Sequence, residues 1–439
     1  MMRIAAIVMG LALLVMLLAT CQGRPGHPWR DPERSPPVIP PAPGPAPTPV
    51  ATVADALAAF SAEPVIGVLL HSAARCDLIL LQTGRSPVGI LPDGTWTISA
   101  GPRGLVLPGL PVVDSLDLRF TAGAGQATFA LETSGPGQRR YGGDLRLLWD
   151  QAEGLVRVIE IIPLERYLPG VLVSEMGPGW PAAALEAQAI AARSFALSRI
   201  AARSGRPWQL DARYEVDMAY PGLVTDQAPA AVAAVQATSG RVLATRSGRI
   251  LPAFFHASSG GRSESVANRW PQTDPGHGGE PYLTVIDDPF AALGAEGLRR
   301  PDADRWQHSM PLTEVAASLT QAITAAGGPP GRRITAVRIV DRFADSHRVR
   351  SVGLRLEGHA DEVLLPATVI RQAIGGTLLR STWWEACLVV GDRLIIHGRG
   401  YGHGVGLSQV SAWAMAQRGL DADTILRFFY RGADIRGLW

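Results

Sequence analysis

Residues 174–205 read S-E-M-G-P-G-W-P-A-A-A-L-E-A-Q-A-I-A-A-R-S-F-A-L-S-R-I-A-A-R-S-G, and this stretch decides the fold. It predicts a turn followed by a long helix, because Pro178 and Gly179 interrupt the preceding segment and Pro181 suits a first helical position. Helix-forming residues then continue for about six turns, and we expect Gly205 to end the helix. One apolar face is predicted from helical spacing, made of Leu185, Ala189, Ala192 and Ala196.

Glu175 lies in the predicted turn before this helix, among apolar residues. No basic residue occurs within eight positions on either side of it. Burial among apolar side chains raises the pKa of a carboxyl group, because it disfavours the charged form. A carboxyl with a pKa near neutrality suits general acid catalysis. The alternative interpretations are an exposed turn residue and a helix cap.

Three motifs resemble, in the same order along the chain, the signature of the stage II sporulation protein D (SpoIID-like) family. The first combines E-M at 175–176, W-P at 180–181 and A-Q-A-I-A-A-R-S at 187–194. The second is F-H-A-S-S-G-G at 255–261, and the third is G-R-G-Y-G-H-G-V-G-L-S-Q at 398–409. The resemblance extends over roughly residues 62 to 439.

This resemblance implies a peptidoglycan lytic transglycosylase that cleaves the MurNAc–GlcNAc bond. Glu175 matches the family's catalytic Glu and would act as general acid and then as general base, leaving 1,6-anhydroMurNAc ends. The alternative is a non-catalytic wall-binding protein that enhances an N-acetylmuramoyl-L-alanine amidase, because the family includes amidase enhancers. A hydrolase would need a second carboxylate. Asp287 and Asp288 before Pro289 are a candidate carboxylate pair, which is interpreted as a structural turn.

The composition excludes several other classes. The chain has 439 residues, 47% of them hydrophobic, which is enough for a large core. Its net charge of +2 gives no indication of nucleic-acid binding. All 41 basic residues are arginine, which removes mechanisms that use a lysine.

The N-terminus resembles an export signal. An apolar run follows Arg3 in residues 1–21, and L-A-T-C at 18–21 resembles a lipobox with Cys21 as the lipidated residue. A cleaved signal peptide and an uncleaved anchor are the alternatives. Residues 22–60 are predicted to be a Pro-rich linker. We therefore expect an exported protein in the cell envelope, tethered to the membrane through its N-terminus.

The rest of the chain predicts an α+β fold: a β-rich scaffold with a few helices and a catalytic Glu in the turn before the central helix. Residues 62–150 contain short alternating runs separated by Gly, Pro and Asp, which predict a β-rich part. Residues 151–439 are assigned to the SpoIID-like catalytic region. Near the C-terminus we expect a Gly-rich loop leading into a helix with Ser408 as N-cap, and Asp421 as N-cap of a last helix.

The motifs supply the candidate substrate-binding residues. They are Gln188, Arg193, His256, Ser259, Tyr401, His403, Ser408 and Gln409. No Cys lies near His256, and zinc sites of the Cys/His type use four such ligands, so no metal and no cofactor is expected. The expected partners are peptidoglycan glycan strands and, in the alternative, a cell-wall amidase, with no nucleic acid. Cys76 and Cys387 form either one disulfide or two free thiols.

Overall fold

The computed structural model describes residues 60–439, except 122, 124, 133–137, 178, 225–227 and 272–280. The predicted signal peptide, Cys21 and the linker up to residue 59 lie outside the described residues. The described chain belongs to one compact unit. None of its described helices combines the length and apolar character needed to cross a membrane. The α+β prediction is confirmed.

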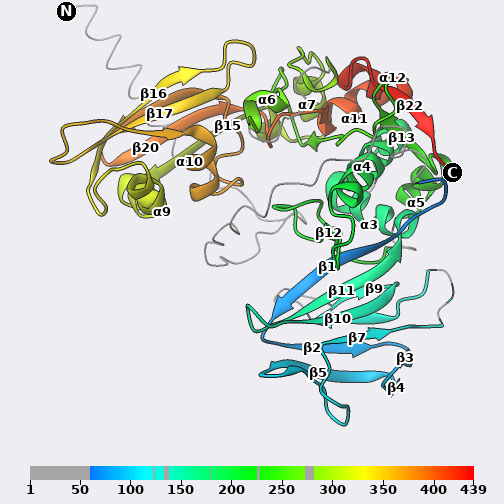
Figure 1. The fold of residues 1–439 in the computed structure, drawn as a ribbon. Coiled ribbons are helices and arrows are strands. Elements are labelled where there is room, and N and C mark those ends of the chain that lie inside the picture. The colour runs from blue at the N-terminus through cyan, green and yellow to red at the C-terminus, as the bar shows by residue number, and fades with distance from the viewer. Residues whose placement is uncertain are drawn as a thin grey trace, which may run out of the picture. The chain divides into compact units, whose positions relative to one another are not determined.

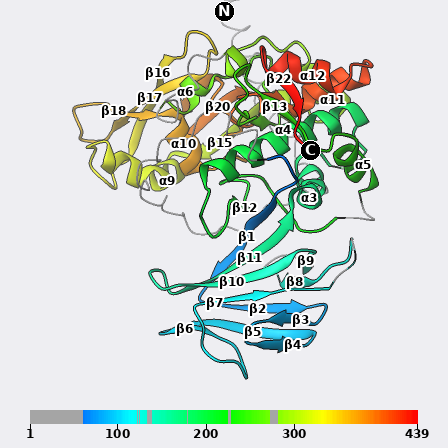
Figure 2. The same ribbon diagram turned by 45° about the vertical axis from the view of Figure 1, so that its right-hand side comes forward.

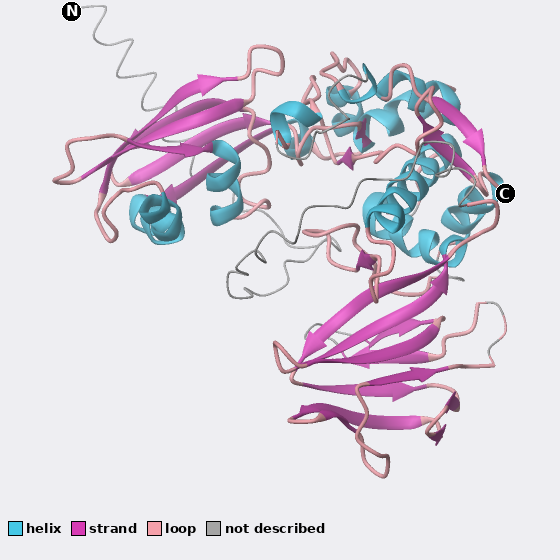
Figure 3. Cartoon of the chain, in the orientation of Figure 1, coloured by secondary structure: helices cyan, strands magenta, loops and turns pink. Residues whose placement is uncertain are grey.

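The N-terminal part consists of strands and loops in its described residues (Figure 3). A first five-stranded sheet has the order β12-β1-β11-β10-β7 and contains β1 (Val65–Ala73), β7 (Ser115–Leu118), β10 (Asp144–Asp150), β11 (Leu155–Pro163) and β12 (Leu210–Asp211). A second sheet has the order β6-β5-β2-β8-β9 and contains β2 (Arg75–Leu80), β5 (Gly94–Gly101), β6 (Gly104–Val106), β8 (Phe129–Glu132) and β9 (Gln138–Tyr141). A small hairpin joins β3 (Gly84–Ser86) to β4 (Gly89–Leu91).

The two sheets share one apolar core, and the strands of both lie close together in two views (Figures 1 and 2). In β2 the side chains of Cys76, Leu78 and Leu80 alternate with more exposed ones, as expected for a strand with one buried face. Strand β10 pairs antiparallel with β11, so the first sheet continues across the boundary predicted between residues 150 and 151.

Glu175 is on a helix and not in a turn, which corrects one part of the prediction. Helix α3 (Leu164–Met176) follows β11 directly, and Glu175 lies in its last turn. The valines and Pro169 of this segment favour a strand or an interruption, but tertiary packing stabilises the helix. A Cβ at Gly170 would lie 2.5 Å from the Gly222 carbonyl oxygen, so the helix approaches this backbone closely. The helix ends at Gly177, whose φ of 78° suits glycine.

The central helix is confirmed as α4 (Ala182–Ala202), with Pro181 at the N-cap. It ends at Ala202, before Gly205, which lies in a turn with a φ of 75°. The predicted apolar face is buried, and residues on the other faces are buried too, because α4 contacts several helices (Figure 1). These are α3, α5 (Pro229–Ala237), α11 (Gln409–Gln417) and α12 (Ala422–Phe429).

Short strands connect segments that are distant in sequence. Strand β13 (Arg241–Ala244) pairs with β22 (Asp434–Gly437), and β14 (Phe255–His256) pairs in parallel with β21 (Leu407–Ser408). A turn lies at Ser247–Gly248, where Thr245 N donates to the Arg249 carbonyl. The helices in this part are α6 (Val266–Arg269), η1 (Pro281–Leu283), α7 (Ala291–Gly297) and α8 (Pro301–Asp304).

The segment from residue 305 to 399 has a hydrophobic core of its own. Its two sheets are β15-β20-β19 and β16-β17-β18, with β15 (Arg305–Pro311), β16 (Ile334–Arg342), β17 (Val349–Leu356), β18 (Val363–Pro366), β19 (Trp384–Val390) and β20 (Arg393–Arg399). The helices are α9 (Leu312–Ala325) and α10 (Ala367–Ile374). The indole of Trp306 donates to the Gly400 carbonyl at 2.9 Å, which connects this segment to the C-terminal motif.

Candidate active site

The carboxyl group of Glu175 is partly buried and has two hydrogen-bond donors. The backbone N–H of Ala219 lies 3.4 Å from its Oε1, and the Nε2 of Gln409 lies 3.3 Å from its Oε2. Burial raises the pKa of Glu175 to about 7, although both hydrogen bonds act in the opposite direction. Glu175 is therefore present as acid and as base in comparable amounts near neutral pH.

The position of Gln409 follows from strand pairing. Strand β21 pairs with β14, so the C-terminal motif and the motif at 255–261 lie side by side. Gln409 is the first residue of α11 and is 5% exposed, with its amide facing Glu175. The three sequence motifs therefore meet in one place, and Gln409 contacts Glu175 across 234 positions of the chain.

His256 and His403 lie together, with ring centroids 5.6 Å apart. Both contact Val405, whose carbonyl is 3.1 Å from His256 Nδ1 and whose N–H donates to His403 Nδ1 at 3.0 Å. Burial, together with nearby arginines, lowers the pKa of His256 to about 3 and that of His403 well below its usual range. Both rings are therefore neutral at physiological pH. The aromatic rings of Phe254 and Trp270 pack against His403.

Ser259 and Ser408 belong to a buried hydrogen-bond network around Asp288. The hydroxyls of Ser259 and Ser411 donate to Asp288 Oδ2 at 2.6 and 2.7 Å. Ser408 occupies the N-cap position of α11, but its hydroxyl does not cap the helix, because it is engaged with Ser411 and accepts from Ser259 N. All three serines are fully buried in this network, and substrate binding by Ser259 and Ser408 stays a prediction. Asp421, in contrast, caps α12 as predicted.

The structure supports the interpretation of the two aspartates as structural. Asp288 is 2% exposed and also accepts from the N–H of Phe290. Asp287 is exposed and forms an ion pair of 2.9 Å with Arg262. In the described part of the chain, neither forms a hydrogen bond with Glu175.

Arg193 is engaged inside the structure, and its role as a substrate-binding residue stays a prediction. Its side chain is fully buried and donates to both carboxylate oxygens of Glu165, at 2.9 and 2.7 Å. It also donates to the carbonyls of Arg241 and Val235. Arg193 is therefore a structural link between α3, α4 and the segment that follows α5.

Gln188 and Tyr401 have different surroundings. Gln188 is fully buried on α4, and neither polar atom of its amide has a hydrogen-bond partner among the described residues. Tyr401 is partly buried, and the guanidinium of Arg380 lies 5.1 Å from its ring centroid. Of the predicted binding residues, only Gln409 hydrogen-bonds with Glu175 within the described chain.

Sequence reasoning missed two features of the site. One is the N–H of Ala219, because a backbone donor leaves no signal in the residue type. The other is a group of arginines beside the C-terminal motif, Arg269, Arg348 and Arg371, which come from three separate segments.

Several further predictions concern groups away from Glu175. Cys76 and Cys387 are both free thiols, one in each of two different sheets. No cluster of three or more His, Cys, Asp or Glu side chains suited to a metal ion occurs among the described residues, so the metal-free site stays a prediction.

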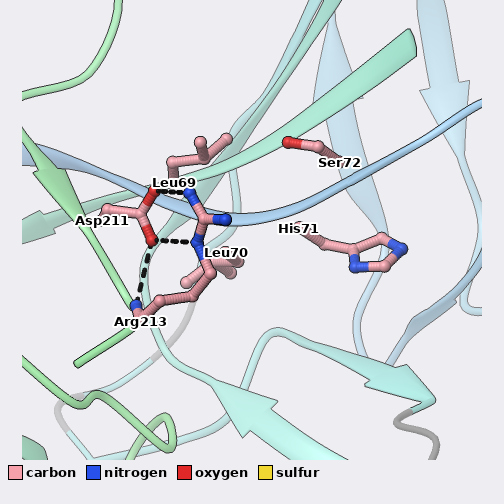
Figure 4. Close-up of a pocket in the computed structure, with 6 residues that line it drawn as sticks. All are labelled: Leu69, Leu70, His71, Ser72, Asp211 and Arg213. Carbon is pink, nitrogen blue, oxygen red and sulfur yellow. Dashed lines mark hydrogen bonds and ion pairs between the residues drawn. The ribbon is translucent and has the colours of Figure 1, made fainter. Parts of the chain in front are cut away.

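A pocket beside β1 is lined by His71, Asp211 and Arg213 (Figure 4). Arg213 points into it and binds Asp211 with two N–H groups, at 2.8 and 2.7 Å.

The three motifs that meet at Glu175 resemble those of the SpoIID family. Residues 152–244 match the family model described as "Stage II sporulation protein". An uncharacterized protein of Brachyspira hyodysenteriae is 29% identical over 281 residues, covering 63% of this chain and 68% of that protein. Stage II sporulation protein D of Bacillus subtilis is 26% identical, covering 63% and 75%. The amidase enhancer of Bacillus subtilis is 26% identical, covering 61% of this chain and 40% of that protein. These matches support the assignment of the chain to the SpoIID-like family.

Proposed function

We propose that this protein is a peptidoglycan lytic transglycosylase of the cell envelope, with Glu175 as its single acid and base. The observation that carries the proposal is the half-buried Glu175 carboxyl, whose pKa of about 7 leaves it able to donate and accept a proton. The family relation and the convergence of three motifs on this group support it.

In the proposed reaction, the Glu175 carboxyl donates its proton to the glycosidic oxygen as the bond to MurNAc C1 breaks. The resulting carboxylate then accepts the proton of the MurNAc 6-hydroxyl, whose oxygen attacks C1. The products are a free 4-hydroxyl on GlcNAc and a 1,6-anhydroMurNAc end, and no water is consumed. The N–H groups of Ala219 and Gln409 stabilise the carboxylate between the two proton transfers.

A second carboxylate is not needed in this reaction, and the nearby ones are engaged elsewhere. Asp217, two residues before Ala219, is fully buried and ion-paired with Arg199 and Arg203 at 3.3 and 2.6 Å. Asp211 is paired with Arg213. Glu175 has no ion-pair partner among the described residues, which distinguishes it from these structural carboxylates.

The test is the Glu175→Gln variant of the full chain, assayed with purified glycan strands. Glutamine keeps the size and can accept one of the two hydrogen bonds, but it cannot donate and recover a proton, so we expect a loss of roughly 10²- to 10⁴-fold in rate. Strand binding should be retained. A rate of cleavage close to that of the unchanged protein would refute the assignment of Glu175.

The second candidate function is enhancement of a cell-wall amidase, favoured by the relative that carries that name. An enhancer would stimulate a purified amidase whether or not residue 175 can transfer a proton. If Glu175→Gln stimulates amidase as well as the unchanged chain does, and neither cleaves glycan, the enhancer function is the correct one.

A further inference from the structure

Guanidinium groups surround residues 401–404 of the C-terminal motif. The Nη2 of Arg371 donates to the Arg380 carbonyl at 3.0 Å, and the N–H of Gly402 donates to the same oxygen at 2.8 Å. The Arg371 side chain therefore lies beside the backbone that presents Tyr401 and His403.

Two more arginines approach the same segment from other elements. The guanidinium of Arg269, at the end of α6, lies 4.9 Å from the ring centroid of Trp270, and that ring lies 5.2 Å from His403. Arg348 packs directly against Gly404, where no space remains for a Cβ. Three positive charges are thus gathered around one short loop.

The described residues do not neutralise this charge. No ion pair to Arg269, Arg348 or Arg371 occurs within the described chain. Glu264 interacts electrostatically with Arg348 and Arg269, and its carboxylate accepts from Asn268 and Ser346 and from the N–H of Ser265. One carboxylate beside three guanidinium groups leaves an excess of positive charge.

Some of the donors in this cluster are unused. Arg348 is fully buried, and its Nε and Nη1 have no hydrogen-bond partner in the described part of the structure. The Nε of Arg371 is likewise buried without a described partner. Burial lowers the pKa of both arginines to about 10, so they stay charged at neutral pH. Buried charged donors without an acceptor are costly, and an anion would satisfy them.

The arginine cluster is connected to the Glu175 site by two segments. The C-terminal motif passes from Tyr401, beside the cluster, to Gln409, which contacts Glu175. The loop at 211–222 carries Tyr214, which is 62% exposed, and Ala219, which donates to Glu175. Arg269 and Arg371 are only partly buried, so part of each side chain is open to solvent.

We propose that Arg269 and Arg371, backed by Arg348, form a carboxylate-binding subsite for the substrate beside the Glu175 site. Planar guanidinium groups bind carboxylates through paired N–H donors. In peptidoglycan the carboxylate has two sources, a free lactyl group on MurNAc or the carboxyl groups of a stem peptide. The identity of the substrate rests on the proposed function, whereas the anion site rests on the arginines themselves.

The test measures binding and not cleavage, on the full chain carrying Glu175→Gln. Two matched pairs of probes are compared. The first pair is glycan strands with free lactyl carboxylates and the same strands with these carboxylates converted to methylamides. The second pair is glycan strands with stem peptides and the same strands with their stem carboxyl groups amidated. We expect amidation of the recognised carboxylate to weaken binding roughly ten- to hundredfold, the scale of a hydrogen bond to a charged group. The strand type that shows this loss identifies the source.

The variants Arg269→Gln and Arg371→Gln should bind charged and amidated strands with equal affinity. Arg338→Gln is the matched control, because Arg338 is an exposed arginine paired with Glu362 and lies in the same part of the chain as Arg371. Circular dichroism and thermal melting show whether Arg371→Gln folds, and Arg269→Gln tests the subsite if it does not.

Two outcomes would overturn the subsite. One is equal binding of charged and amidated strands by the parent chain. The other is a loss of binding affinity in the arginine variants that is equal for charged strands and for a chito-oligosaccharide without carboxylates. If the unchanged chain cleaves none of the strands, the proposed function is wrong, but the binding comparison still decides the subsite.

Discussion

The hydrogen bond between Gln409 and Glu175 can be tested through the pH dependence of cleavage. Burial moves the pKa of Glu175 from 4.5 to about 7. At pH 7 this change raises the protonated fraction from roughly 0.3% to roughly one half, a gain of about 150-fold in available acid. The hydrogen bond from Gln409 opposes this shift, because it stabilises the carboxylate.

The variant Gln409→Leu keeps the approximate volume of the side chain and removes the donor. A hydrogen bond to a charged group contributes about 1.5 to 3 kcal/mol, and the 3.3 Å distance places this one at the lower end. One pKa unit corresponds to about 1.4 kcal/mol. We therefore expect the pKa of Glu175 to rise by about one unit, so that activity declines at a pH about one unit higher on the alkaline side.

The assay is the initial rate of release of soluble glycan fragments from pH 5 to 9. Gln417→Leu is the matched control, because Gln417 is an exposed glutamine on the same helix α11. Its pH profile should equal that of the unchanged protein. An alkaline limb that stays in place in Gln409→Leu, whatever happens to the maximal rate, would refute this account of how Glu175 is tuned.

The remaining predictions concern products, stability and metals. Mass spectrometry should find 1,6-anhydroMurNAc ends, and reducing ends that carry ¹⁸O from labelled water would instead indicate a hydrolase. Replacing the fully buried Arg193 by Met leaves Glu165 unpaired, so denaturant unfolding should show a loss of about 3 kcal/mol; a loss below about 1 kcal/mol would contradict its structural role. Activity should survive a chelator, and His403→Ala should reduce turnover whether or not zinc is added, since no third metal-binding side chain joins His256 and His403 among the described residues. Loss of activity with the chelator and recovery with zinc would show a metal site.

Local patterns in the sequence were sufficient for elements that depend on neighbouring residues. The alanine-rich run after Pro181 predicted α4, because helix propensity and burial favour the same conformation there. Asp421 caps α12 through a side chain that reaches only three residues along the chain. The apolar neighbours of Glu175 predicted a raised carboxyl pKa, and burial of this group in the structure acts in that direction.

Only the tertiary structure decided which side chains reach the site and which become internal supports. Glu175 lies on a helix because α3 packs closely on the backbone at Gly222, and no local pattern encodes that contact. Arg193 belongs to the motif that includes Glu175, yet its side chain is buried and donates to the carboxylate of Glu165. Gln409 reaches Glu175, and the arginines gather around residues 401–404, through chain segments that are far apart in sequence. Such contacts depend on how strands and helices pack, so the residue types alone could suggest candidates but not their neighbours.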